Sequence, residues 1–195
     1  MKTIHALKPV RTVAPAETPL TLAEAKAHLR VDSTDEDDLV TAYLEGATAA
    51  LDGWSGILGR CLVTQTWRQD FREFSDPLRL PFPDVASVAV AYIDTDDASQ
   101  TLATSVYELA EDNLGAYLTL KDGQTWPSLG EVTVAVSVTL TCGYGAAADV
   151  PADLKDAIRL DIGTRYQFRE TMGEQAAPNM AYESLVSKHR RVGLS

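Results

Sequence analysis

The sequence has few of the residues that most enzyme sites use. Its 195 residues include two cysteines and three histidines, and 28 acidic residues against 17 Lys and Arg give a net charge of −11. This charge argues against a nucleic-acid binder held by phosphate contacts, although an acidic surface can still face DNA as a lining that repels it. Cys61 and Cys142 lack a C-x-x-C partner. We interpret them as two buried thiols in a reducing cytoplasm, with one disulfide as the alternative.

A long apolar run is also missing. The longest uncharged stretch, residues 132–148, alternates with Thr and Ser and ends in glycines. This pattern is typical of a strand and a loop and not of a membrane span. No apolar core of a signal peptide follows the basic residues near the N-terminus. We therefore expect a soluble, cytoplasmic protein without a membrane partner.

No catalytic motif is present. The histidines fall in three separate segments, and H-E-x-x-H, G-x-S-x-G and the P-loop are absent. Carboxylates are plentiful, but none belongs to a recognisable constellation, so a solvated acidic face is the simplest interpretation. We expect no catalytic residues, no metal site and no cofactor. Trp54, Trp67 and Trp126 are interpreted as core or interface anchors.

Two local patterns imitate binding sites. Gly143-x-Gly145-x-x-Ala148 follows a strand and precedes a helix, as a dinucleotide fingerprint does. However, the helix restarts only at Pro151, and the preceding strand is half polar, unlike a buried parallel strand. The acidic run at residues 32–38 resembles a calcium loop, but it lacks the midway glycine, and Tyr43 stands where the bidentate Glu belongs.

Three helices are expected. Thr21 and Glu24 form a capping box that starts a short helix ending near Arg30. Ser33 and Glu36 predict a second capping box and a helix over residues 35–54. Pro151 predicts the start of a third helix, which ends near residue 169. Its buried stripe is expected at Leu154, Ala157 or Ile158, Ile162, and Arg165 or Tyr166.

Between the second and third helices the hydrophobic period changes to two. Strands are expected at residues 61–67, 78–80, 88–92, 107–109, 116–120 and 132–142. The predicted fold class is therefore α+β: a helical core, made of two N-terminal helices and one long C-terminal helix, with an inserted and mostly antiparallel β unit. We assign residues 19–60 and 143–170 to the core and residues 61–142 to the insertion.

The two ends of the sequence have a different character. Residues 1–18 contain prolines and most of the local basic charge, which predicts an extended arm, either disordered or bound as a strand to a partner. Residues 171–195 are interpreted as a linker and a C-terminal tail, whose basic cluster is the one charge reversal in an acidic chain. The tail is either a solvated terminus or a docking peptide. The candidate docking residues are Tyr182, Leu185, Val186, Lys188, Arg190 and Arg191.

The order of these elements resembles the phage head–tail connector, or adaptor, family (gp6-like), in particular its branch with a β insertion. The resemblance covers most of residues 18–170. Its motifs are TPLTLAEAK at 18–26, DDLV at 37–40 through AALD at 49–52, LVTQTWR at 62–68, and CGYG at 142–145 through VPADLKDAI at 150–158. The tail also resembles the family's terminal docking segment, but less closely. The family pattern leaves the arm at residues 1–16 unaccounted for.

The resemblance implies a structural role without catalysis. It implies a ring subunit, dodecameric in the assembled particle, that binds the portal protein and a tail-side stopper or tail terminator protein. DNA would pass through the ring without specific binding. A virus, a prophage or a gene transfer agent would each fit, with assembly in the bacterial cytoplasm and a final place at the head–tail junction. The alternatives are a small acidic hydrolase with carboxylates in the β unit, or a generic binding module.

Overall fold

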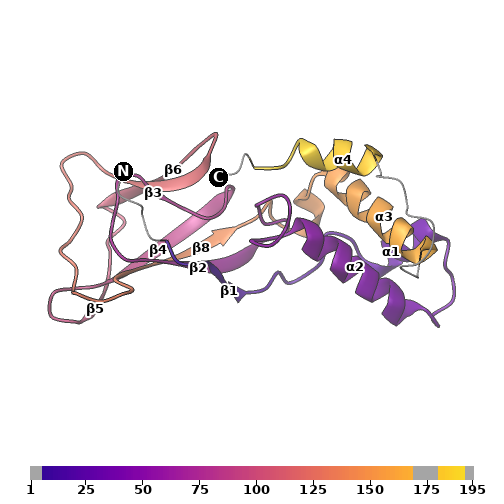
Figure 1. The fold of residues 1–195 in the computed structure, drawn as a ribbon, viewed down its shortest axis with the longest axis horizontal. Coiled ribbons are helices and arrows are strands. Elements are labelled where there is room, and N and C mark those ends of the chain that lie inside the picture. Colours follow the sequence, from indigo (N-terminus) through magenta and orange to yellow (C-terminus); the bar gives the residue numbers. More distant parts are fainter. Residues whose placement is uncertain (1–5, 169–179, 192–195) are drawn as a thin grey trace. The chain divides into compact units, whose positions relative to one another are not determined.

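A computed structural model describes residues 6–168 and 180–191. It contains α-helices and antiparallel β-sheets, which confirms the expected α+β class. The chain divides into two compact units. Of the described residues, we call 16–63, 144–168 and 180–191 the helical unit, and 6–15 and 64–143 the β unit (Figure 1). Within the described residues, no helix has the length and apolar character needed to cross a membrane.

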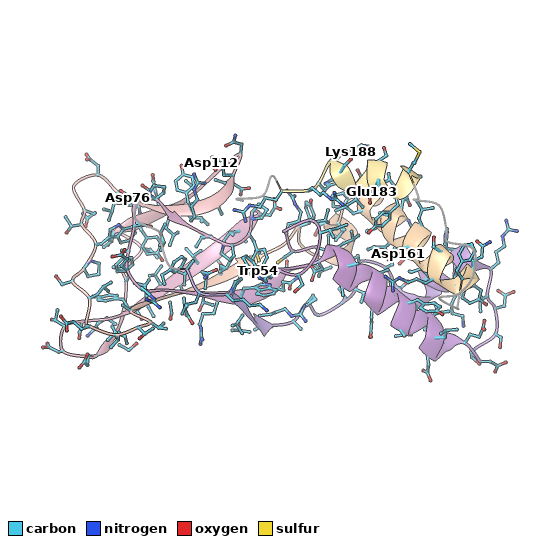
Figure 2. The ribbon with its side chains drawn as sticks, viewed as in Figure 1. Trp54, Asp76, Asp112, Asp161, Glu183 and Lys188 are labelled. Carbon is cyan, nitrogen blue, oxygen red and sulfur yellow. The ribbon has the colours of Figure 1, made fainter. Side chains whose placement is uncertain are left out.

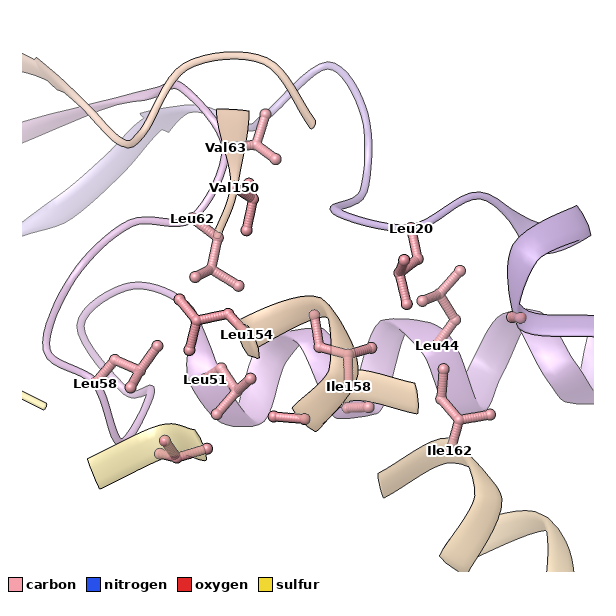
Figure 3. Packing of buried hydrophobic residues seen from close by; sticks show 14 of the residues in the cluster. Leu20, Leu44, Leu51, Leu58, Leu62, Val63, Val150, Leu154, Ile158 and Ile162 are labelled. Carbon is pink, nitrogen blue, oxygen red and sulfur yellow. The ribbon is translucent and has the colours of Figure 1, made fainter. Parts of the chain in front are cut away.

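The helical unit is built on antiparallel packing of two long helices. Figure 3 shows Leu51 beside Leu154 at one end of this pair and Leu44 near Ile162 at the other. All four side chains are buried, and they belong to one hydrophobic cluster. The elements of this unit are α1 (Leu22–Leu29), α2 (Asp37–Leu51), the short 3-10 helix η1 (Ala147–Asp149), α3 (Ala152–Gln167) and α4 (Met180–Ser187).

The first capping box is confirmed and the second is wrong. The Thr21 hydroxyl accepts from the Glu24 amide, and the Glu24 carboxylate accepts from the Thr21 amide. At the start of α2, the N-cap position is taken by Glu36, without a side-chain hydrogen bond. The Ser33 hydroxyl accepts instead from the amide of Asp35, 3.1 Å away, because a serine can bind a backbone group two residues on as readily as one three residues on.

The third helix agrees closely with its prediction. Its first residue is Ala152, with Pro151 at the N-cap, and its buried residues are Leu154, Ala157, Ile158 and Ile162. The stripe ends there, because Arg165 and Tyr166 are only half-buried. The linker expected at residues 171–179 lies outside the described residues.

The β unit contains two antiparallel sheets. One has the strand order β1-β2-β8-β4-β5 and the other β3-β7-β6. The strands are β1 (Val10–Val13), β2 (Gln65–Phe71), β3 (Leu78–Arg79), β4 (Val85–Ile93), β5 (Ser99–Thr101), β6 (Tyr107–Asp112), β7 (Gly115–Leu120) and β8 (Val136–Cys142). Part of the expected N-terminal arm thus forms β1, which pairs with β2 of the same chain.

The two sheets enclose one hydrophobic core. Phe71 of β2 pairs with Val136 of β8, and both side chains are buried. They share a cluster with Leu118 of β7 and Tyr107 of β6, which belong to the other sheet. The alternation of buried and more exposed residues along β2 and β8 follows from the period of two in a strand.

Two strand predictions were wrong in position. The strand expected at residues 61–67 begins only at Gln65, because Leu62 and Val63 are buried in the core of the helical unit. The strand expected from Val132 begins at Val136, and Val132 is exposed. The short polar strand β5 was not predicted.

Candidate docking surfaces

The C-terminal helix α4 lies against the helical unit of its own chain. Val186 is fully buried and belongs to the same core cluster as Leu58 and Leu154. Tyr182 and Leu185 are half-buried and pack against that cluster. Burial raises the pKa of the Tyr182 hydroxyl, and the negative charge of Asp161 adds to this rise. Three of the six candidate docking residues therefore serve the chain's own core.

The segment after α4 is fixed by polar contacts. The Nε2 atom of His189 lies 2.8 Å from Oδ2 of Asp153, and its Nδ1 lies 3.4 Å from the hydroxyl of Tyr144. The Arg60 guanidinium donates to the same hydroxyl over 2.6 Å. The hydrogen bond from His189 holds the pKa of the Asp153 carboxyl below its ordinary value. This network joins the tail to α3 and to the loops around Arg60 and Tyr144.

The remaining candidates face solvent to different degrees. Lys188 and Arg190 are exposed, and Arg190 lies 3.4 Å from the Glu183 carboxylate. Arg191 is half-buried, and its backbone amide donates to the carbonyl of Leu58 over 3.0 Å. Figure 2 shows Lys188 and Glu183 on the α4 side of the helical unit. The structure thus brings the six candidates together on one segment and leaves its charged groups on the surface.

The glycine loop that imitates a phosphate site is occupied by the chain's own carboxylates. Gly143 and Gly145 have φ values of 128° and 133°. The Ala146 amide donates to Oδ2 of Asp149 over 2.9 Å, and a Cβ atom at Gly145 would lie 2.4 Å from the same oxygen. The Ala147 amide donates to Glu17 over 2.7 Å. Amide groups that already donate to carboxylates are not available to donate to a phosphate.

Four described carboxylates have a pKa that is shifted away from the range of a general acid. Glu24, Asp94, Asp112 and Asp153 have clearly shifted pKa values, and all four are lowered. The causes are hydrogen bonds to each carboxylate, from backbone amides or from Thr21, Gln100, Arg79 and His189. A hydrolase would need at least one raised carboxyl pKa in a cleft. Among the described residues, no group of three His, Cys, Asp or Glu side chains could hold a metal ion.

The tryptophans and cysteines take structural positions. Trp67 is buried, with its ring centroid 4.9 Å from that of Phe82, and Trp126 stacks on Phe74 at 4.6 Å. Trp54 is 46% exposed and lies three residues after the end of α2. Both cysteines are buried as free thiols.

Comparison with known proteins finds a family-model match for part of the chain and a shared fold for nearly all of it. Residues 19–66 match the model of the family described as "Phage gp6-like head-tail connector protein". A chain in the neck of an empty GTA particle computed with C6 symmetry is 24% identical, with a TM-score of 0.78. A chain in the virion of a native gene transfer agent (GTA) particle is also 24% identical, with a TM-score of 0.76. A chain in the neck of a native GTA particle computed with C12 symmetry is 23% identical, with a TM-score of 0.75.

In all three cases the likeness covers 97% of this chain and 98% of the other chain. At this level of identity it establishes the fold that they share, β unit included. Curated protein sequences contain no match.

Proposed function

We propose that the chain is a structural subunit of a head–tail connector ring, because residues 19–66 match the model of the phage gp6-like head–tail connector family. The observation that carries the proposal is the family match, which spans α1, α2 and the chain up to the start of β2. The fold shared with neck chains of gene transfer agent particles supports it. The role is structural, and catalysis has no part in it.

The subunit forms a dodecameric ring at the junction of capsid and tail, around the channel through which DNA passes. The sixfold and twelvefold symmetries used for the related neck structures support a ring of this order. The net charge of −11 suits such a channel, because a lining that bound phosphates would slow the passage of DNA. Assembly takes place in the bacterial cytoplasm, before the ring becomes part of the particle.

The C-terminal segment docks on the portal protein, and the β unit contacts a tail-side stopper or tail terminator. The structure refines the docking proposal. Since Val186 lies in the core, and Tyr182 and Leu185 pack against it, these residues hold the segment in place. Lys188 and Arg190 are exposed and present positive charge to an acidic portal surface.

A charge reversal tests the docking more cleanly than a truncation. Deleting residues 180–195 would remove Val186 from the core and would not leave the fold intact. The double variant Lys188→Glu with Arg190→Glu keeps every buried side chain. We expect it to fold normally. The amount that loads onto portal rings should fall about tenfold or more below that of the unaltered protein.

The matched control reverses one exposed cation of the β unit, Arg72→Glu, and should load normally. Normal loading of the C-terminal variant would contradict docking through this segment. An acidic hydrolase is not favoured, because the family match is to a head–tail connector protein.

A further inference from the structure

Each sheet of the β unit has two edges, and two of these four edges are long enough to bind another strand. β1 has four residues and β6 has six, whereas β3 and β5 have two and three. Among the described residues, β1 pairs only with β2, and β6 pairs only with β7. Edge strands present unpaired amides and carbonyls, and proteins use them to bind extended segments.

The edge at β1 is apolar and basic. All four residues of β1 are exposed, and Val10 and Val13 are 52% and 58% exposed. Lys8 precedes the strand and is exposed, and the Arg11 guanidinium lies 6.0 Å from the centre of the Trp67 ring. Two exposed valines and two cations on one edge are unusual in a chain with a net charge of −11.

The edge at β6 is acidic. Glu108 and Glu111 are exposed, and Glu111 accepts a hydrogen bond from the Asp84 amide over 3.3 Å. Asp112, at the end of the strand, is paired with Arg79. The two glutamates therefore give this edge a net negative charge. Figure 1 shows β6 and β1 on opposite sides of the β unit.

We propose that β1 of one copy binds along β6 of the next copy, so that neighbouring subunits meet through these two edges. The charges are complementary, since Lys8 and Arg11 of one copy would face Glu108 and Glu111 of the other. Val10 and Val13 would be covered in the contact. The contact joins two different surfaces of the same chain, and such a contact forms a ring when its repeated rotation closes on itself. This inference rests on the ring of the proposed function.

The test exchanges the signs of the two edges. The first variant, Lys8→Glu with Arg11→Glu, has two acidic edges. The second variant, Glu108→Lys with Glu111→Lys, has two basic edges. We expect the number of rings that each variant alone forms on portal complexes to be about tenfold or more below that of the unaltered protein. An equimolar mixture should form rings again, because every contact in an alternating ring then joins opposite charges.

Ring formation is counted by electron microscopy, and folding is checked by circular dichroism. Arg72→Glu and Glu131→Lys, two exposed charges elsewhere in the β unit, serve as matched controls and should assemble normally. Normal assembly of both edge variants, or failure of the folded variants to assemble when mixed, would overturn the strand contact.

A second measurement needs no substitution. Rings assembled from equal parts of unlabelled and 15N-labelled protein are treated with a zero-length reagent that joins amines to carboxylates. The expected product links Lys8 of one isotope to Glu108 or Glu111 of the other. Rings that form without any such link would contradict the contact while leaving the connector function standing. If the unaltered protein forms no ring on the portal, the proposed function itself fails.

Discussion

His189 binds Asp153 across 2.8 Å and joins the C-terminal segment to the first turn of α3. The same imidazole lies 3.4 Å from the Tyr144 hydroxyl, to which Arg60 also donates. The tail is thus held by a polar network at its end and by Val186 in the core. The polar network and the burial of Val186 together leave only the exposed side chains of the tail available to a partner.

The first prediction concerns the hydrogen-bonded pair of His189 and Asp153. Asp153→Asn should lower the free energy of unfolding by up to roughly 1 kcal/mol near neutral pH, since the pair is only partly buried. The pKa of Asp153 is lowered in the folded state, so its contribution is present above the unfolded value of about 3.9 and is lost as the pH falls through the folded value. Urea unfolding of the unaltered protein and the variant at several pH values measures this. A difference that persists unchanged in acid would contradict the assignment.

The second prediction concerns Asp112 and Arg79. Two guanidinium nitrogens of Arg79 donate to the two carboxylate oxygens of Asp112, each over 2.6 Å. This hydrogen bonding lowers the pKa of Asp112 to about 2. A carbon-detected NMR titration should therefore find its midpoint near that value, and Arg79→Leu should return the midpoint toward about 3.9. If the titration midpoint of Asp112 is the same with and without the Arg79 substitution, the pair does not form in solution.

The third prediction separates two apolar residues of α4. Val186 is fully buried, whereas Met180 is 83% exposed. Val186→Ala should reduce the free energy of unfolding by about 2 kcal/mol, because it removes two buried methyl groups and leaves a cavity. Met180→Ala is the matched control and should change it by less than about 0.5 kcal/mol. Equal effects in urea unfolding would show that α4 does not pack as described.

The fourth prediction uses two glycines. A Cβ atom at Gly163, inside α3, would make an ordinary contact of 3.5 Å with the His28 side chain. Gly163→Ala should therefore stabilise the protein by roughly 0.5–1 kcal/mol, the usual gain in a helix interior. At Gly56 the same atom would lie 2.3 Å from the Leu51 carbonyl oxygen, so Gly56→Ala should destabilise the fold. Thermal melting of both variants checks the opposite signs.

Local chemistry made part of the fold predictable. The capping box at Thr21 and the stripe from Leu154 to Ile162 depend on residues within a few positions of one another, and both are confirmed. The local patterns of the helical and β segments were therefore sufficient to predict the α+β fold class. The Ser33 capping box failed even though its pattern was equally clear, because the hydroxyl had a nearer amide to bind.

The features that were not predictable from the sequence depend on tertiary packing. Leu62 and Val63 have the composition of a strand, yet the helical core buries them. Val186 looked like a docking anchor because an apolar residue in a tail has the same pattern whether it faces a partner or its own core. The carboxylate of Asp149 fills the glycine loop from four residues beyond Gly145, which no spacing rule indicates. The open edges of β1 and β6 follow from strand order, which needed the structure.

The most direct test of the connector function is to locate the protein in a particle. Cryo-electron microscopy of purified particles, with a small tag fused to this chain, should show a ring of tagged subunits between the portal and the tail. Particles lacking the protein should accumulate as heads without attached tails. Tag density elsewhere in the particle, or normal tail attachment without the protein, would contradict the connector function.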